Sequence, residues 1–124
     1  MAILKQIHNA KGTTSTTDGT TWVTVASYPL STNATTMLET WLVGKDSTGK
    51  VATNKSVQGL ERISGTNTLI GSIVDILTFA LGSNAALVTC ASRLNISGDN
   101  IQLQVKGVAA TTIEWMGGFE IKIN

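Results

Sequence analysis

The sequence predicts an all-β fold, an antiparallel β-sandwich of jelly-roll or Greek-key type with about seven or eight strands. Three observations lead to this prediction. Apolar and polar residues alternate with a period of two near the C-terminus, turn signals recur at short intervals, and the 124 residues include 19 Thr, 8 Asn and 12 Gly. Thr favours strands, whereas Asn and Gly favour tight turns.

The last third of the chain carries the clearest alternation. Apolar side chains at 101, 103 and 105 alternate with polar ones at 102, 104 and 106, after a turn at 97–100. From Thr111 to Ile123 one face is predicted to be apolar, and Gly117-Gly118 marks a bulge or a close backbone approach. The predicted apolar face of this strand consists of Ile113, Trp115, Phe119, Ile121 and Ile123, and the opposite face of Glu114, Met116, Glu120 and Lys122.

Earlier strands are predicted between turn signals. The β-branched and aromatic residues 22–28 end at the turn Pro29-Leu30-Ser31. A second strand, 36–45, is followed by the turn 46–49, and then by residues 50–63, one long strand or a pair interrupted by Gly59. Leu94 and Ile96 alternate before the turn at 97–100.

Residues 69–81 fit two patterns. Their apolar positions match a helical stripe, but Ile, Val, Thr and Phe are strand formers and Gly71 disfavours a helix. The β-like surroundings favour a strand.

The domain organisation is predicted to be simple. Residues 1–21 lack hydrophobic periodicity and form an N-terminal arm or extended segment, and residues 22–124 form a single β-sandwich domain.

Composition and charge argue against several partners. Charged residues make up 14% and the net charge is +1, so nucleic acid is not expected as a partner. The longest apolar stretch, 69–81, is too short and polar to cross a membrane, and the N-terminus lacks a signal-peptide core. We expect synthesis in a reducing cytoplasm.

No arrangement of residues predicts catalysis. His8 is the only histidine, the eight carboxylates are dispersed, and the phosphate-binding and nucleophile-elbow motifs are absent from the sequence. Cys90 lies in an apolar run and is predicted to be an inert buried thiol. We therefore expect no enzyme activity, no catalytic residue, no cofactor and no metal site.

The aromatic residues are candidates for a binding surface. Trp115 is predicted to lie in the core and Trp41 in the core or an interface. Trp22 and Tyr28 border the polar N-terminal segment, so they are the residues predicted to contact a ligand such as a glycan, or a partner.

Several strands are apolar at consecutive positions, which indicates self-association. A sandwich strand normally buries one face, and a chain of this size has too little interior for both. We predict a homo-oligomer, with a trimer favoured over a dimer. The predicted interface residues are Val23, Val25, Trp41, Leu42 and Val43.

Residues 37–123 contain an ordered series of segments: Trp-Leu-Val-Gly-Lys-Asp-Ser-Thr-Gly, Gln-Gly-Leu-Glu-Arg, Ser-Gly-Thr-Asn-Thr-Leu-Ile-Gly-Ser, Gly98–Gly107, and Thr111–Trp115. In these segments and their order, the chain resembles a β-sandwich module of tailed-bacteriophage virion proteins, found in head decorations, head fibres and tail-fibre tips. The sequence departs from the module at Lys106, where Thr is more usual, and in the apolar segment 69–81.

This resemblance implies a scaffold and carries over no functional residues. It implies a non-enzymatic structural virion protein, an oligomeric capsid decoration or cement protein or a head-appendage subunit, that contacts other virion proteins such as the major capsid protein. The alternative is a receptor- or glycan-binding module of a phage tail fibre, with host surface glycan as its partner.

Overall fold

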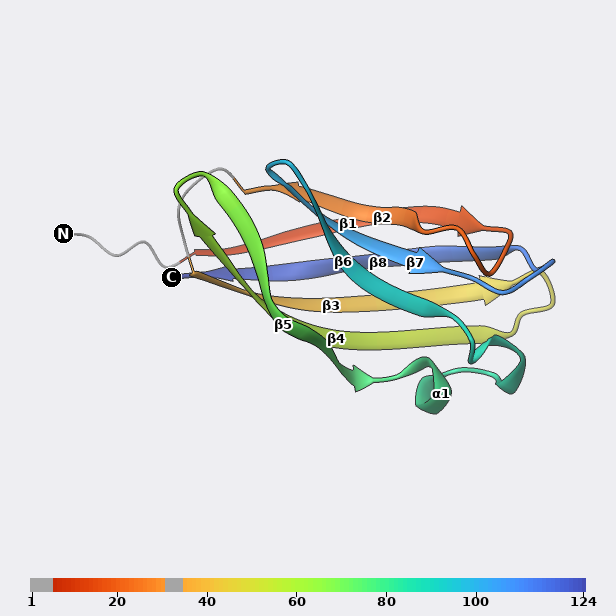
Figure 1. The fold of residues 1–124 in the computed structure, drawn as a ribbon. Helices are drawn as coiled ribbons and strands as arrows, with labels where there is room; N and C mark the ends of the chain where they lie inside the picture. The colour runs from red at the N-terminus through yellow and green to blue at the C-terminus, as the bar shows by residue number, and fades with distance from the viewer. Residues whose placement is uncertain (1–5, 31–34) are drawn as a thin grey trace.

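The computed structural model describes residues 6–30 and 35–124, and these residues form two antiparallel sheets (Figure 1). Five strands lie in the order β1-β8-β3-β4-β5 and three in the order β2-β7-β6. The elements are β1 (Gln6–Thr16), β2 (Val23–Pro29), β3 (Thr35–Asp46), β4 (Val51–Ile63), β5 (Thr66–Leu77), α1 (Phe79–Gly82), η1 (Ala85–Leu87), β6 (Ala91–Ser97), β7 (Asn100–Lys106) and β8 (Ile113–Ile123). The predicted all-β sandwich is confirmed.

The connections place a late strand beside an early one. β3, β4 and β5 follow one another as hairpins, and β8 returns to pair with β3. The order β8-β3-β4-β5 is the Greek-key relation of three consecutive strands and a fourth beside the first, here with the β6–β7 hairpin inserted before the return.

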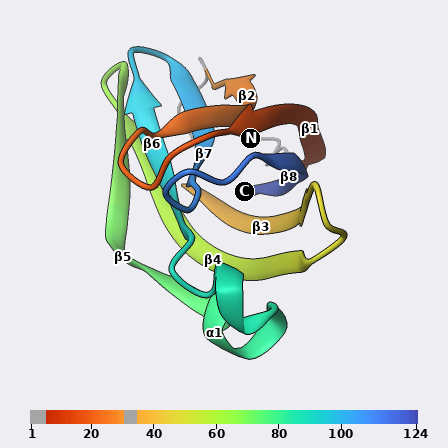
Figure 2. The ribbon, with the colours of Figure 1, turned by 90° about the vertical axis from the view of Figure 1, so that its right-hand side faces the viewer.

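The five-stranded sheet curls around the smaller one. Seen from the end, β1 lies near β2 and β5 lies near β6, so the two edges of the sandwich almost meet (Figure 2). The core fills the space between the sheets, and its largest buried side chains include Trp115, Phe119, Leu38, Leu42 and Leu103.

The C-terminal alternation is confirmed in detail. The side chains at 113, 115, 119 and 121 are buried, and those at 114 and 116 are exposed. Gly117 and Gly118 lie in strand pairings without a register shift, so they mark a close backbone approach and not a bulge. A Cβ on Gly117 would lie 2.8 Å from the Trp41 carbonyl oxygen, and one on Gly118 would collide with the Ala10 carbonyl oxygen.

Residues 69–81 combine both alternatives. They continue β5 as far as Leu77, and a single helical turn, α1, begins at Phe79. The favoured strand is therefore confirmed over 69–77. It ends where Thr78 caps the helix, its Oγ1 accepting a hydrogen bond from the Leu81 backbone N–H (3.3 Å).

The predicted N-terminal arm includes a strand of the sandwich. Residues 6–16 pair with β8 along their whole length. Trp115 Nε1 donates a hydrogen bond to the buried Thr16 Oγ1 (2.9 Å), which ties the end of β1 to the core. Residues 1–5 of the arm, and Ser31 of the predicted turn, lie outside the described residues.

Among the described residues, no helix is long and apolar enough to cross a membrane.

Candidate functional site

The outward-facing side of the five-stranded sheet is rich in exposed apolar side chains, and we call it the outer apolar face. Val43 on β3 and Met116 on β8 are register partners and are 41% and 51% exposed. Trp41 stands two residues from Val43, opposite Gly118, and is 37% exposed. Other exposed apolar residues of this face include Ile7, Met37, Val51, Ile63, Ile70 and Val74.

This face is large for a solvent-exposed sheet surface. Antiparallel sheets that face water normally carry polar residues on that side. Here apolar side chains extend over all five strands, from Ile7 on β1 to Val74 on β5. These exposed apolar side chains lie among charged ones such as Lys55, the register partner of Trp41, and exposed apolar side chains in this number are typical of an interaction site.

Two of the predicted interface residues lie on this face and the others do not. Trp41 and Val43 point outward, whereas Leu42, between them, is 1% exposed and lies in the core. Val25 is also buried, because a register shift between Thr24 and Ala26 turns it inward next to Ala26. Val23 is partly buried on β2. The pleat of β3 buries Leu42 and the register shift in β2 buries Val25, so neither is exposed as the predicted interface requires.

Three charged side chains near the centre of the outer apolar face pair with one another, whereas Lys55, the register partner of Trp41, forms no ion pair among the described residues. Glu39 and Glu120 are register partners, and Lys122 Nζ lies 3.1 Å from Glu39 Oε1 and 3.7 Å from Glu120 Oε1. The hydrogen bond to Glu39 and the negative charges of both glutamates raise the pKa of Lys122. The ammonium group thus relieves a repulsion between like charges on adjacent strands.

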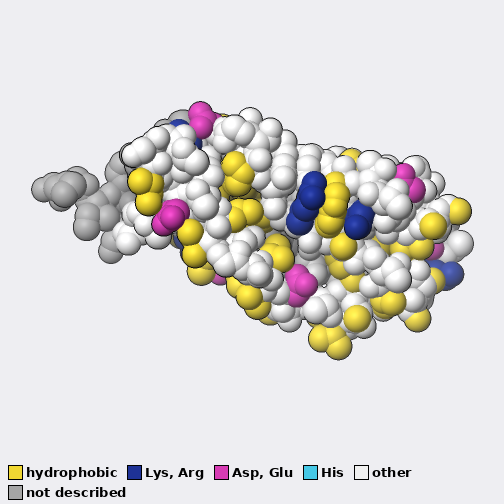
Figure 3. Space-filling model, in the orientation of Figure 1, with side chains coloured by type: hydrophobic (Ala, Val, Ile, Leu, Met, Phe, Trp, Pro, Cys, Tyr) yellow, Lys and Arg dark blue, Asp and Glu magenta, His cyan; other side chains and the backbone are white. Residues whose placement is uncertain are grey.

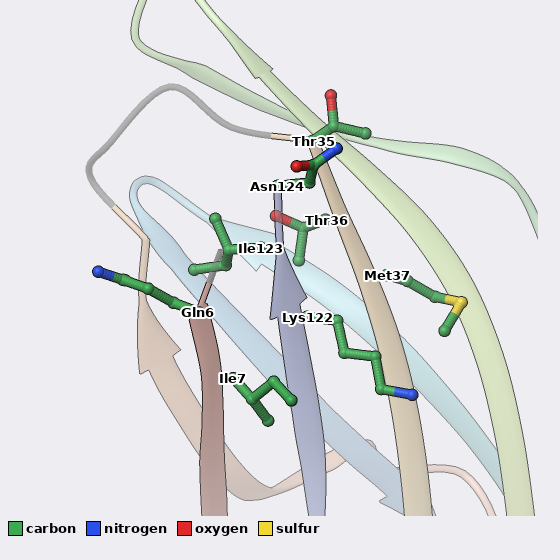
Figure 4. A pocket seen from close by; sticks show the side chains of 8 residues that line it. All are labelled: Gln6, Ile7, Thr35, Thr36, Met37, Lys122, Ile123 and Asn124. Atoms are coloured by element: carbon green, nitrogen blue, oxygen red, sulfur yellow. The ribbon is translucent and has the colours of Figure 1, made fainter. Parts of the chain in front are cut away.

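A hollow of about 510 Å³ lies at the end of this face where β1, β8 and β3 meet. Figure 4 shows Ile7, Ile123 and Met37 around it, with the Lys122 side chain running alongside. Lys122 is the only Asp, Glu, Lys or Arg side chain in its lining, so the hollow extends the apolar surface of this face.

The outward side of the three-stranded sheet has a different character, and we call it the amide face. Gln104 on β7 accepts a hydrogen bond from Arg93 Nε (2.7 Å) and donates to Thr24 Oγ1 (3.2 Å). Asn95 Nδ2 donates to Gln102 Oε1 (2.9 Å). Hydrogen bonds between these side chains thus connect β2, β7 and β6.

Trp22 crosses the amide face between two cations. The Arg93 guanidinium lies 4.4 Å and the Lys106 ammonium 4.7 Å from the centroid of its ring. Figure 3 shows two basic groups on this side of the molecule with apolar surface between them. Both cations therefore contact the aromatic ring that was predicted to contact a ligand.

The second predicted ligand residue lies elsewhere. Tyr28, near the end of β2, packs at 5.5 Å from the His8 ring on β1, and His8 Nε2 is hydrogen-bonded to Gln6. Trp22 and Tyr28 are six residues apart on an extended segment, so the structure does not join them into one site. The cation contacts of Trp22 were not apparent in the sequence, because Arg93 and Lys106 come from other strands.

The described residues contain no cluster of three or more His, Cys, Asp or Glu side chains that could hold a metal ion. Cys90 is buried, and burial raises the pKa of its thiol to about 11. A thiol with this pKa remains protonated at neutral pH and is a poor nucleophile.

The chain matches no protein-family model, and no curated protein matches it. The solved structures that are similar to it include two of phage proteins. One is the tailspike protein of Acinetobacter baumannii phage AM24, with 12% identity and a TM-score of 0.45 over 94% of this chain and 26% of that chain. The other is the tailspike protein gp49 of Acinetobacter baumannii bacteriophage Fri1, a capsular polysaccharide depolymerase, with 11% identity and a TM-score of 0.42 over 95% of this chain and 20% of that chain.

This chain therefore spans about a quarter of the first tailspike and a fifth of the second. At this identity and TM-score, the likeness assigns neither an activity nor a partner to this chain.

Proposed function

We propose that the chain is a non-enzymatic structural module that assembles with copies of itself, as a trimer, in the virion of a tailed bacteriophage. The observation that carries this proposal is the outer apolar face, where Trp41, Val43 and Met116 stand exposed at the centre of a five-stranded sheet. The resemblance of residues 37–123 to virion modules supports the virion as its place, as a capsid decoration or head appendage.

The chemistry of the face supports a protein partner. Interface cores are depleted in unpaired charge and enriched in aromatic residues and Met. The outer apolar face has one Trp and two Met residues exposed, and the central Lys122 is paired with Glu39 and Glu120. Burial of such surface contributes ~25 cal/mol per Å² of apolar area, repeated at each symmetric contact.

Sedimentation velocity tests the assembly. We expect a single species of three chains at micromolar concentration. A monomer that persists at about a hundred micromolar would contradict the proposal. Antibody labelling of phage particles then distinguishes the head surface from the tail, and turnover of a capsular polysaccharide by the purified protein would refute the non-enzymatic assignment.

A second candidate function is the binding of an acidic glycan by the amide face, as in a receptor-binding module of a tail fibre. The observation that favours it is the pair Arg93 and Lys106, which form no ion pair with a carboxylate among the described residues. Two fixed cations beside a row of amides suit carboxylate groups on a hydroxyl-rich polymer.

Binding to alginate, with neutral dextran as the control, tests this candidate. We expect saturable binding of alginate that is lost in the double variant R93Q/K106Q and kept in K45Q/K55Q, which removes two cations from the other sheet. Equal binding by both double variants would contradict a role for the amide face.

A further inference from the structure

The three strands of the amide face carry charge of one sign only. β2, β6 and β7 contain Arg93 and Lys106 but no Asp or Glu. Both cations point outward, because Leu94 and Val105, their neighbours in the sequence, are buried. The carboxylate of Asp99, in the turn between β6 and β7, pairs with an arginine of β4. The amide face therefore has a positive charge that no carboxylate of its own strands neutralises.

Trp22 holds the two cations close together. The Arg93 guanidinium lies 4.4 Å and the Lys106 ammonium 4.7 Å from the centroid of its ring. Because both distances end at the same centroid, the two charges are at most about 9 Å apart, which is within the Debye length of about 10 Å in 0.1 M salt. Both charges therefore act on the same bound anion chain.

The guanidinium of Arg93 is positioned by two groups. Its Nε donates a hydrogen bond to Gln104 Oε1 (2.7 Å), and Gln104 Nε2 donates in turn to Thr24 Oγ1 (3.2 Å). The ring of Trp22 is the second group. The two terminal nitrogens of Arg93 form no hydrogen bond and no ion pair among the described residues. These nitrogens are the donors that pair with a carboxylate in a bidentate geometry.

Lys106 has a flexible side chain whose ordering costs entropy when it binds a ligand. Contact with the Trp22 ring restricts the ammonium group before any ligand arrives, so this cost is lower. The ammonium group forms no ion pair among the described residues and is available to a second carboxylate.

We propose that Trp22 fixes Arg93 and Lys106 as a two-cation clamp, which binds two carboxylates of one acidic glycan chain. The proposal rests on the second candidate function above and adds that the ligand carries repeated carboxylates. Trp22 is a positioning residue in this clamp. A single uronic acid contacts one cation only, whereas a chain contacts both, and its second contact forms within the complex.

NMR chemical-shift titration with mannuronate and with linear tetramannuronate tests the clamp. The wild type should bind the tetramer at least about 30-fold more tightly than the single sugar, whereas the number of carboxylates alone accounts for about fourfold. Arg93→Gln and Lys106→Gln should each lower this ratio to about fourfold, because only one cation remains. Lys45→Gln, which removes a cation from the other sheet, is the control and should keep the wild-type ratio.

Two variants of Trp22 separate positioning from folding. Trp22→Ala keeps both cations without the ring, so we expect the ratio of the two affinities to fall about fivefold. Trp22→Phe keeps an aromatic ring and should restore the ratio to within about twofold of the wild type. Loss of folded protein does not change the ratio, because the titration follows the signals of the folded chain for both ligands.

The outcomes distinguish the clamp from glycan binding as such. If the wild type binds alginate but its ratio is only about fourfold, or if Trp22→Ala keeps the wild-type ratio, the clamp is refuted and the glycan candidate stands. If the wild type does not bind alginate, or if R93Q/K106Q binds it like the wild type, both fail.

Discussion

The two outward faces of this sandwich are both formed by antiparallel strands, but their side chains have different contacts. Side chains of the amide face contact one another, whereas apolar side chains of the outer apolar face are exposed to solvent. On the amide face, Gln104 bonds to Arg93 and Thr24, and Trp22 is held by Arg93 and Lys106. On the outer apolar face, Val43 and Met116 stand side by side in solvent with half of their surface exposed.

The difference shows which surface depends on a partner. Polar side chains on the amide face find hydrogen-bond partners within the chain, so that face contributes to the stability of the isolated fold. Apolar side chains gain free energy only when water is excluded from them, and on the outer apolar face nothing among the described residues excludes it. We expect substitutions on the amide face to change the free energy of unfolding, and substitutions on the outer apolar face to change the association constant.

Val43→Lys should have the largest effect. A lysine at the centre of the outer apolar face places a charge in the contact, and we expect association at least about 30-fold weaker, the size of a strong interface substitution. Sedimentation equilibrium measures it. Ser27→Lys, an exposed change on β2 of the other sheet, is the control, and equal weakening by both variants would mean that net charge and not the face controls association.

Gln104→Ala should act on stability instead. It leaves Arg93 Nε and Thr24 Oγ1 without their partner on a side chain that is only 9% exposed, and we expect the free energy of unfolding to fall by about 1–3 kcal/mol. Urea unfolding measures this loss. Val43→Ala, compared at concentrations where both proteins are monomeric, should cost less than about 0.5 kcal/mol, and a larger loss there would erase the contrast between the faces.

Trp22→Ala should have a smaller effect on the same face. It removes two cation–π contacts, so we expect a loss of about 1–2 kcal/mol in the free energy of unfolding. Trp22→Phe keeps an aromatic ring between Arg93 and Lys106 and should restore most of this loss. Equal losses in both variants would show that indole packing and not the cation contacts matters.

Salt should have the smallest effect on association. Contacts between apolar surfaces are not weakened by ionic screening, so we expect the association constant to stay within about threefold between about 0.01 and 1 M NaCl. Light scattering across this range measures it. A steep fall with salt would indicate that ion pairs hold the copies together.

The period-two pattern made most strands predictable. Apolar residues such as Ile113, Trp115 and Ile121 alternate with other residues. In a strand with one buried face, this alternation puts the apolar side chains on the buried side. The strand at residues 6–16 was less apparent, because its Thr-rich sequence becomes a defined strand only through hydrogen bonds to β8, which lies about a hundred residues later.

The candidate site shows the same division. The consecutive apolar residues Trp41, Leu42 and Val43 predicted an interface at all three positions. The alternation of the strand exposes Trp41 and Val43 and buries Leu42. The neighbours of Trp22 in the sequence predicted that its ring is available to a ligand. The pairing of β2, β7 and β6 brings Arg93 and Lys106 into contact with this ring.

The sequence alone thus determined the all-β class, the turns and the inward faces of the strands. Successive side chains of a strand point to opposite faces, so a pattern over neighbouring residues is sufficient to identify the buried face. Tertiary structure alone decided which outward-facing side chains find hydrogen-bond or cation–π partners within the chain. Those partners come from strands that meet only in the folded sheet.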